Sequence, residues 1–190
     1  MSKLDLEAFL HTLRTAGWHV RISDRDALDL NPKVLGRYSV IPEPYLEFLR
    51  QVAECSNAAQ NAWFLCVGDF NGDENDATTF RWNEWERIGL DAAEGDEELI
   101  GPIVQFWDTH LPIMSSVHSD YSYLAISLVP DEFGAIVYGY APDFEDAETI
   151  SDSFEDFLCE FQRIVSGDVS AEYVGTDGER YFRREFSDFL

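Results

Sequence analysis

Apolar residues recur at the spacing of an amphipathic helix in three separate stretches of the chain. Residues 4–16 predict the first helix. The second helix is predicted from Pro44, because a proline in the first turn of a helix costs no hydrogen bond. The third helix is predicted to begin at a cap formed by Asp152 or Ser153. The expected buried faces consist of Leu4, Leu6, Phe9, Leu10 and Leu13, of Tyr45, Phe48, Leu49 and Val52, and of Phe154, Phe157, Leu158, Phe161 and Val165.

Other stretches are rich in β-branched and aromatic residues and predict strands. They are residues 18–22, 63–70, 112–117, 121–128 and 134–141, and the last two predict a β-hairpin. Residues 97–108 have a helical pattern apart from Gly101-Pro102, and residues 80–90 are ambiguous. Strands and helices do not alternate regularly. We therefore expect an α+β fold in a single domain, with a largely antiparallel central sheet flanked by helices.

Acidic residues dominate the charge of the chain. It has 37 aspartates and glutamates against 13 lysines and arginines, which gives a formal net charge of −24. Nucleic acids and anionic membrane surfaces are bound through basic residues, so neither is an expected partner. A field of this sign attracts a cationic protein and speeds its association. The alternative is that the charge serves solubility alone.

The remaining composition indicates a folded protein without a membrane segment. Apolar residues make up 45% of the chain and aromatic residues 14%, which is enough for a substantial core. The apolar runs are far shorter than a bilayer-spanning helix requires. The first residues are polar and acidic where a signal peptide needs an apolar stretch, so we expect a cytoplasmic protein.

Residues that could bind a metal lack the required spacing. The three cysteines, Cys55, Cys66 and Cys159, contain no C-x-x-C pair and have apolar neighbours, which is typical of buried thiols. The stretch Asp69-x-Asn71-x-Asp73-x-Asn75 begins like a calcium loop. Its sixth and twelfth positions are Glu74 and Phe80, where a calcium loop needs glycine and a bidentate glutamate. We expect neither a metal site nor a cofactor.

Residues of the types used in catalytic triads occur in one short stretch, Ser115, Ser116, His118 and Asp120. A triad needs its members to converge in space beside an oxyanion hole, and neighbours at one strand end diverge. Pairs of carboxylates are inevitable in so acidic a chain and carry little information. We therefore expect no catalytic residues and a protein that is not an enzyme.

Four segments of the chain share a pattern with one known family. They are Arg37-Tyr38 with Ile41-Pro42-x-x-Tyr45-x-x-Phe48-Leu49; Phe80-x-Trp82-x-x-Trp85-Glu86; Tyr123-Leu124-Ala125-Ile126 with Gly134-Ala135-Ile136-Val137-Tyr138; and Ile150-x-x-Ser153-Phe154-x-x-Phe157-Leu158. In this order they resemble the SUKH superfamily, which includes a yeast regulator of cell-wall glucan synthesis and many bacterial immunity proteins of polymorphic toxin systems. The resemblance covers about residues 35–166 and leaves residues 1–20 and 168–190 as additions to one SUKH-like domain. The chain departs from it at residues 54–59, where many members have an Asn-Gly-Gly turn.

The acidic residues are concentrated in two regions. Residues 67–100 contain eleven acidic and two basic side chains, and residues 141–161 contain eight acidic and no basic ones. Carboxylates with interspersed aromatic rings can steer a cationic partner and then hold it. The candidate partner-binding residues are Asp73, Glu74, Asp76, Trp82, Trp85, Glu86, Asp143, Phe144, Glu145 and Asp146.

Together with the resemblance, this surface predicts a non-enzymatic immunity protein that covers a cationic toxin, for instance a nuclease. A regulatory or scaffolding module is the alternative, and a small hydrolase or metal-dependent enzyme is less favoured. A competing interpretation places the rings of Trp82, Trp85 and Phe144 in the core, with the charges as their solvated rim.

Overall fold

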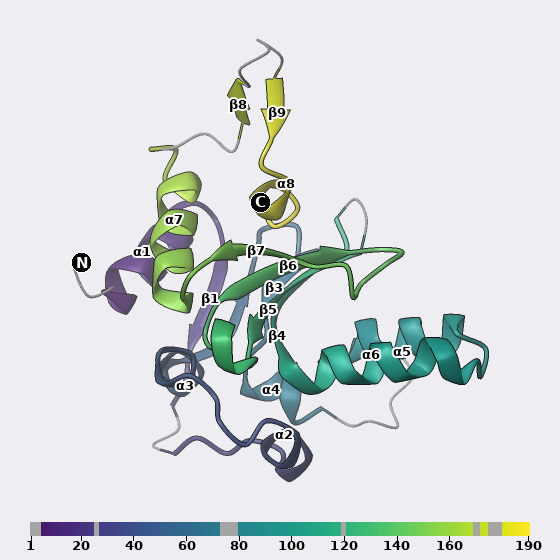
Figure 1. Ribbon diagram of the computed structural model, residues 1–190. Coiled ribbons are helices and arrows are strands. Elements are labelled where there is room, and N and C mark those ends of the chain that lie inside the picture. Colours follow the sequence, from purple (N-terminus) through teal and green to yellow (C-terminus); the bar gives the residue numbers. More distant parts are fainter. Residues whose placement is uncertain (1–4, 25–26, 73–79, 119–120, 169–171, 175–179) are drawn as a thin grey trace.

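An open antiparallel sheet runs through the centre of the computed structural model, which describes residues 5–24, 27–72, 80–118, 121–168, 172–174 and 180–190 (Figure 1). Within these residues the sheet has seven strands in the order β1-β2-β3-β4-β5-β6-β7, so that each strand pairs with its neighbours in the sequence. The strands are β1 His19–Ile22, β2 Val52–Ser56, β3 Ala62–Phe64, β4 His110–Ser116, β5 Ser122–Ser127, β6 Ile136–Tyr140 and β7 Glu148–Ser151. A separate pair is formed by β8 Glu172–Val174 and β9 Arg180–Phe182.

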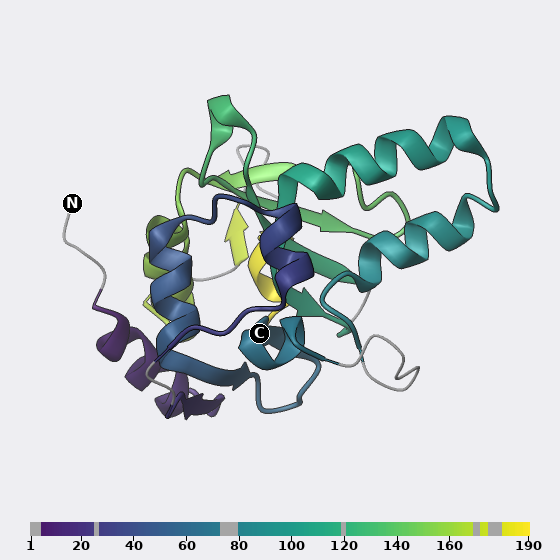
Figure 2. The same ribbon diagram turned by 90° about the horizontal axis from the view of Figure 1, so that it is seen from below.

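Helices cover both faces of this sheet, which gives the predicted α+β fold in a single domain. The longer helices are α1 Leu6–Thr15, α3 Glu43–Gln51, α5 Glu84–Ala92, α6 Glu97–Thr109 and α7 Phe154–Val165. The short ones are α2 Pro32–Arg37, α4 Val67–Phe70, the 3-10 turn η1 Pro130–Glu132 and α8 Arg184–Ser187. In both ribbon views α5 and α6 form a pair that projects to one side, away from α1, α3 and α7 (Figures 1 and 2).

The alternation of side chains along the central strands divides the interior into two cores. On β5, Leu124 and Ile126 face the larger core with α1, α3 and α7. Tyr123 and Ala125 on the same strand face a smaller core with α5 and α6. Successive side chains of a strand point to opposite faces, so this one strand contributes to both cores.

The structure confirms the three helices predicted from the amphipathic patterns, and local hydrogen bonds fix their ends. The Asp5 carboxylate caps α1 by accepting hydrogen bonds from the N–H groups of Glu7 and Ala8, at 3.1 and 3.2 Å. Gly17, with φ +91°, ends this helix. At α7 the cap is Ser153, whose Oγ accepts from Asp156 N at 3.1 Å.

The predicted strand over residues 63–70 is only partly correct. Strand β3 ends at Phe64, and α4 begins at Val67. The Asp69 carboxylate accepts a hydrogen bond from Cys66 N at 2.7 Å, which closes a capping box and turns the chain into the helix. Strand β2 had no separate signal, because the apolar stripe of α3 continues into Val52.

Helix α6 also differs from the prediction, because it continues through Gly101 and Pro102. Proline removes one helical hydrogen bond and normally kinks or ends a helix. Here both residues are exposed, so water can reach the carbonyl that has lost its donor.

The end of the chain packs back on the domain. Phe186 and Phe189 are fully buried, and the ring of Phe186 stacks on Phe157 of α7 with centroids 6.1 Å apart. Tyr138 of β6 donates a hydrogen bond to the Asp188 carboxylate at 2.8 Å. The last residues of the chain therefore complete the larger core.

Candidate functional site

The predicted partner-binding residues divide into three groups in the structure. Asp73, Glu74 and Asp76 lie outside the described residues. Trp82, Trp85, Glu86 and Phe144 are buried, and Asp143, Glu145 and Asp146 form a turn at the surface. The predicted acidic–aromatic surface therefore differs in its composition from what the sequence suggested.

The three predicted aromatic anchors belong to the interior. Trp82 lies against Tyr38 with ring centroids 6.0 Å apart and is 8% exposed. Trp85 and Phe144 are each 1% exposed, and their rings are 5.4 Å apart in the smaller core. The hypothesis that these rings contact a partner disagrees with their burial, because Trp82 packs in the larger core and Trp85 and Phe144 pack in the smaller one.

Glu86 is also structural rather than available at the surface. It is 6% exposed, and its two carboxylate oxygens accept hydrogen bonds from Arg37 at 2.6 and 2.7 Å. The Arg37 Nε donates to Asp108 at 2.9 Å. Burial alone lowers the pKa of Arg37, but the bonds to Glu86 and the nearby charges outweigh it, so this pKa is raised. The cluster joins α2 to α5 and α6.

The turn at residues 143–146 is anchored from within. The Phe144 carbonyl accepts a hydrogen bond from the Tyr123 hydroxyl, and the Glu145 carboxylate accepts one from Trp107 Nε1 at 3.0 Å. Asp146 N donates to the Asp143 carbonyl at 3.0 Å, which closes the turn. As a result the side chains of Asp143 and Asp146 are held in solvent.

Two tyrosines that the sequence interpretation missed supply exposed rings next to this turn. Tyr121 is 50% exposed and Tyr140 is 39% exposed. The Tyr121 carbonyl accepts a hydrogen bond from Ala141 N at 2.8 Å, which places it directly beside the chain that leads to Asp143. The available signal was position, because Tyr121 directly precedes β5 and Tyr140 is the last residue of β6.

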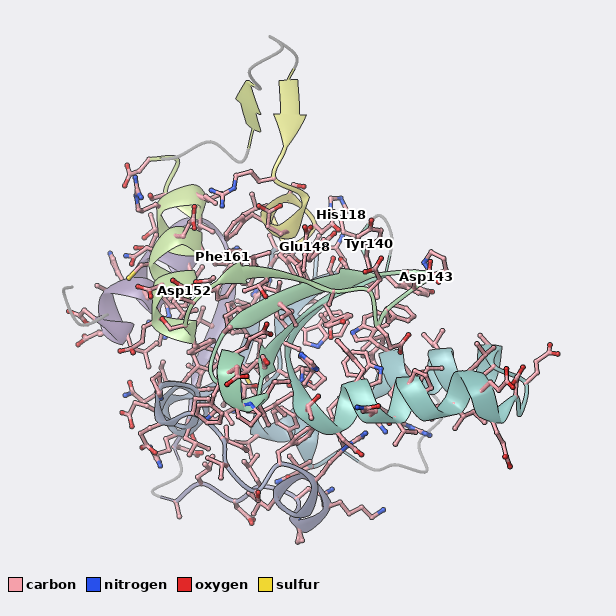
Figure 3. All side chains as sticks on the ribbon, viewed as in Figure 1. His118, Tyr140, Asp143, Glu148, Asp152 and Phe161 are labelled. Atoms are coloured by element: carbon pink, nitrogen blue, oxygen red, sulfur yellow. The ribbon has the colours of Figure 1, made fainter. Side chains whose placement is uncertain are left out.

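Register places a further carboxylate beside the ring of Tyr140. Glu148 pairs with Tyr138, so it shares a sheet face with Tyr138 and Tyr140 and is a diagonal neighbour of the latter. Figure 3 labels Tyr140, Asp143 and Glu148 along this edge of the sheet. We call the surface at this end of the sheet the acidic–tyrosine face; it is formed by Val117, His118, Tyr121, Tyr140, Asp143, Asp146 and Glu148. The Tyr121 ring lies on the side of α5, 5.5 Å from Trp85, and the Tyr140 ring lies on the other side of the sheet, 5.6 Å from Tyr138.

The carboxylates of this face carry their charge without neutralising partners among the described residues. None of the ion pairs found there includes Asp143, Asp146 or Glu148. All three side chains are exposed. The face can therefore attract a positively charged surface and present aromatic rings to it.

The residue types of a catalytic triad do not converge within the described part of the chain. Ser115 Oγ accepts a hydrogen bond from Trp85 Nε1 at 3.2 Å, and the Ser116 hydroxyl donates to the Asp188 carbonyl. Both serines are buried, His118 is exposed, and Asp120 is not described. The serines thus have structural partners.

The cysteines and carboxylates form no metal cluster among the described residues. Cys55 and Cys66 are buried, and burial raises the pKa of both thiols, which keeps them protonated. Asp69 and Asn71, the described members of the calcium-like stretch, hold the fold together. Asp69 caps α4, and the Asn71 amide donates to the Asp29 carbonyl at 2.7 Å.

Two further findings concern the helices of the chain and its comparison with known proteins. In the part of the chain that the structure describes, every helix is too short or too polar to cross a membrane. Searches against protein-family models, curated proteins and solved structures found no match to this chain.

Proposed function

We propose that the chain is a non-enzymatic binding protein that captures a basic protein partner on its acidic–tyrosine face and blocks the partner by covering it. The form of this function that we favour is an immunity protein whose partner is a cationic toxin, such as a nuclease. The resemblance to SUKH immunity proteins suggests this form, and a regulatory or scaffolding role would use the same kind of contact.

One observation carries the proposal: this end of the sheet exposes a tyrosine ring on each side, Tyr121 and Tyr140, together with three exposed carboxylates that no described ion pair neutralises. Tyrosine is enriched among residues that dominate binding energies, because it buries a large area and keeps a polar tip. The carboxylates would raise the rate of encounter with a basic surface. The net charge of −24 adds a long-range field of the same sign.

The arrangement of the polar groups supports binding rather than catalysis. The serines at the end of β4 are engaged with Trp85 and with the chain end near Asp188. The buried carboxylate Glu86 is engaged with Arg37. A surface of exposed rings and charges needs no further group to act by occlusion.

The test begins with capture of the partner from the native host, followed by affinity measurements. We expect Tyr121→Ser with Tyr140→Ser to weaken binding at least about tenfold, since each ring would act as an anchor. The matched control is Phe133→Ser, which removes another exposed ring, 45% exposed, at the opposite end of the β5–β6 hairpin. An unchanged affinity in the tyrosine variant, or an equal loss in the control, contradicts the proposal.

A second arm tests the charges separately. Asp143→Lys with Asp146→Lys should lower the association rate and weaken its dependence on salt. Asp131→Lys with Glu132→Lys makes the same change in net charge at η1 and should have a smaller effect. Inhibition of the captured partner's activity would favour an immunity protein, whereas binding without inhibition would favour the scaffolding role.

A further inference from the structure

A second surface, separate from the acidic–tyrosine face, is hollowed. Helices α1, α3 and α7 enclose an open groove of about 850 Å³. It is lined by Asp5, Leu6, Glu7, Glu43, Pro44, Glu47, Phe48, Gln51, Phe154, Glu155 and Leu158. We call this the three-helix groove. Asp152, which precedes the cap of α7, and Asp143 lie at opposite ends of the segment that contains β7 (Figure 3).

The floor of the groove rests on apolar side chains of the larger core. Phe48, Phe154 and Leu158 are nearly fully buried, and the rings of Phe48 and Phe154 contact each other at 5.8 Å between centroids. Leu6 of α1 and Pro44 of α3 are partly exposed along the sides. Such a concavity between packed helices can accept apolar side chains without first opening the core.

The rim is acidic on every helix. Its carboxylates belong to Asp5, Glu7, Glu43, Glu47 and Glu155, and the adjacent cation is Arg50, which pairs with Glu43 at 2.6 Å and with Glu47 at 3.1 Å. No ion pair between described residues includes Asp5, Glu7 or Glu155. Glu7, Glu43 and Glu155 lie in the first turn of their helices and Asp5 is the N-cap of α1, so the helix dipoles stabilise their negative charge.

This combination restricts what can occupy the groove. Anionic lipid and nucleic acid are repelled by the rim. A second copy of the chain carries the same net charge of −24 and is disfavoured for the same reason. An amphipathic segment with apolar side chains on one face and lysine or arginine beside them satisfies both the floor and the rim.

We propose that the three-helix groove is a docking site for a basic amphipathic helix. Helices of this kind lay an apolar face into a hydrophobic groove, with anchors one turn apart. The flanking lysines or arginines would pair with Glu7, Glu47 and Glu155. This site goes beyond the proposed capture of a folded basic partner, since it recognises a single segment and does not need the acidic–tyrosine face.

The test uses a fluorescently labelled synthetic peptide with leucines at helical spacing and lysines on the other face, and the full chain. We expect Glu47→Lys with Glu155→Lys to weaken its binding at least about tenfold, because two rim contacts become repulsive. Glu97→Lys with Glu98→Lys is the matched control. It changes the net charge equally and also alters a helix first turn, that of α6. This control should lower affinity much less.

Two further arms separate groove binding from general attraction between opposite charges. A peptide of identical composition with its leucines scrambled off one face should bind at least about tenfold more weakly. Tyr121→Ser with Tyr140→Ser should leave binding of the amphipathic peptide unchanged. Equal binding of the scrambled peptide, equal loss in the α6 control, or loss in the tyrosine variant would each overturn the proposal. None of these results depends on the proposed function.

If Glu155→Lys disturbs α7, circular dichroism will show it, and Leu6→Gln then provides an independent variant. Leu6 is partly exposed at the side of the groove, so its replacement removes apolar surface without opening the core. Weaker peptide binding with an unchanged fold supports the proposal, and unchanged binding contradicts it.

Discussion

The acidic–tyrosine face and the three-helix groove present the same sign of charge on different shapes. On the face, the rings of Tyr121 and Tyr140 provide partly exposed apolar surface on the two sides of the sheet end. In the groove, the accessible apolar side chains are those of Leu6 and Pro44 along the sides, above the buried Phe48 and Leu158. Charge draws a basic partner toward either region, whereas shape decides what each can hold. A folded basic surface suits the face, and a single helical segment suits the groove.

The two regions also differ in how they are supported. Tyr121 and the turn at residues 143–146 lie beside the smaller core, whose helices are joined to α2 through Arg37, Glu86 and Asp108. The groove is built on the larger core, where its floor is part of continuous apolar packing. Removing one partner of a buried ion pair leaves an uncompensated charge and lowers stability strongly, whereas replacing an exposed rim carboxylate lowers it little. Single substitutions can therefore test the difference in support.

The largest expected effect comes from breaking the ionic connection. Glu86→Gln leaves Arg37 without its bidentate partner in a largely buried position and should lower the free energy of unfolding by about 3 kcal/mol. Glu47→Gln, at the exposed rim of the groove, should change it by less than about 0.5 kcal/mol. Urea unfolding of the three proteins measures both values.

A double substitution serves as the control for this prediction. Arg37→Met with Glu86→Leu removes both charges and should recover most of the lost stability, because apolar side chains of similar size can replace a buried ion pair. If Glu86→Gln is no more destabilising than Glu47→Gln, the ion pair does not support the smaller core.

A smaller effect is expected at the cap of α7, which forms one wall of the groove. Ser153→Ala removes the acceptor for Asp156 N and should cost about 1 kcal/mol of stability. Ser166→Ala, at the other end of the same helix, should cost less. Binding of the amphipathic peptide should weaken with the first substitution, while partner binding at the face should not. Equal effects on both surfaces would mean that the two regions are not independent.

The helices and the hairpin were predictable because each is specified by its own stretch of sequence. The stripe of Phe154, Phe157, Leu158 and Phe161 identifies α7, and the alternation around residues 121–141 identifies β5 and β6. Fold class followed from the order of these elements. Where two signals overlap, as at Val52 between α3 and β2, the boundary depends on tertiary contacts and could not be assigned.

The candidate sites were harder to predict, because exposure depends on which elements cover which face. Acidic neighbours suggested that Trp85 and Phe144 were at the surface, yet α5 and α6 enclose them. The partner of Glu86 is Arg37, which is distant in the sequence. Two of the segments that carry the SUKH resemblance meet in this ion pair, which gives those residues a structural role. The groove gathers residues from three separate helices.

The smallest expected effect is a pH dependence of stability that arises from a buried histidine near the smaller core. His110, at the junction of α6 and β4, is 9% exposed and stacks on Phe106 with centroids 4.1 Å apart, whereas His11 on α1 is exposed. Burial lowers the pKa of His110 below 6.5, although its hydrogen bond with the Phe106 carbonyl and the charge of Glu132 oppose this. The folded protein therefore favours the neutral ring. The contribution of the neutral His110 ring to the free energy of unfolding is fully present above about pH 6.5 and is lost as the pH falls below that value.

His110→Gln removes this titrating group. The quantity to measure is the difference in unfolding free energy between wild type and variant at each pH. As the pH is lowered from about 7.5 to about 5.5, the wild type should lose unfolding free energy relative to the variant. Only the wild type has a His110 ring that must lose a proton, or be buried with its charge, when the chain folds. The matched control is His11→Gln, which makes the same change of residue type at an exposed position on α1. The many carboxylates titrate in all three proteins, so their contribution cancels in each difference. A pH-independent difference for His110→Gln would show that the smaller core tolerates the charged ring, and the pH contrast between the two regions would then be lost.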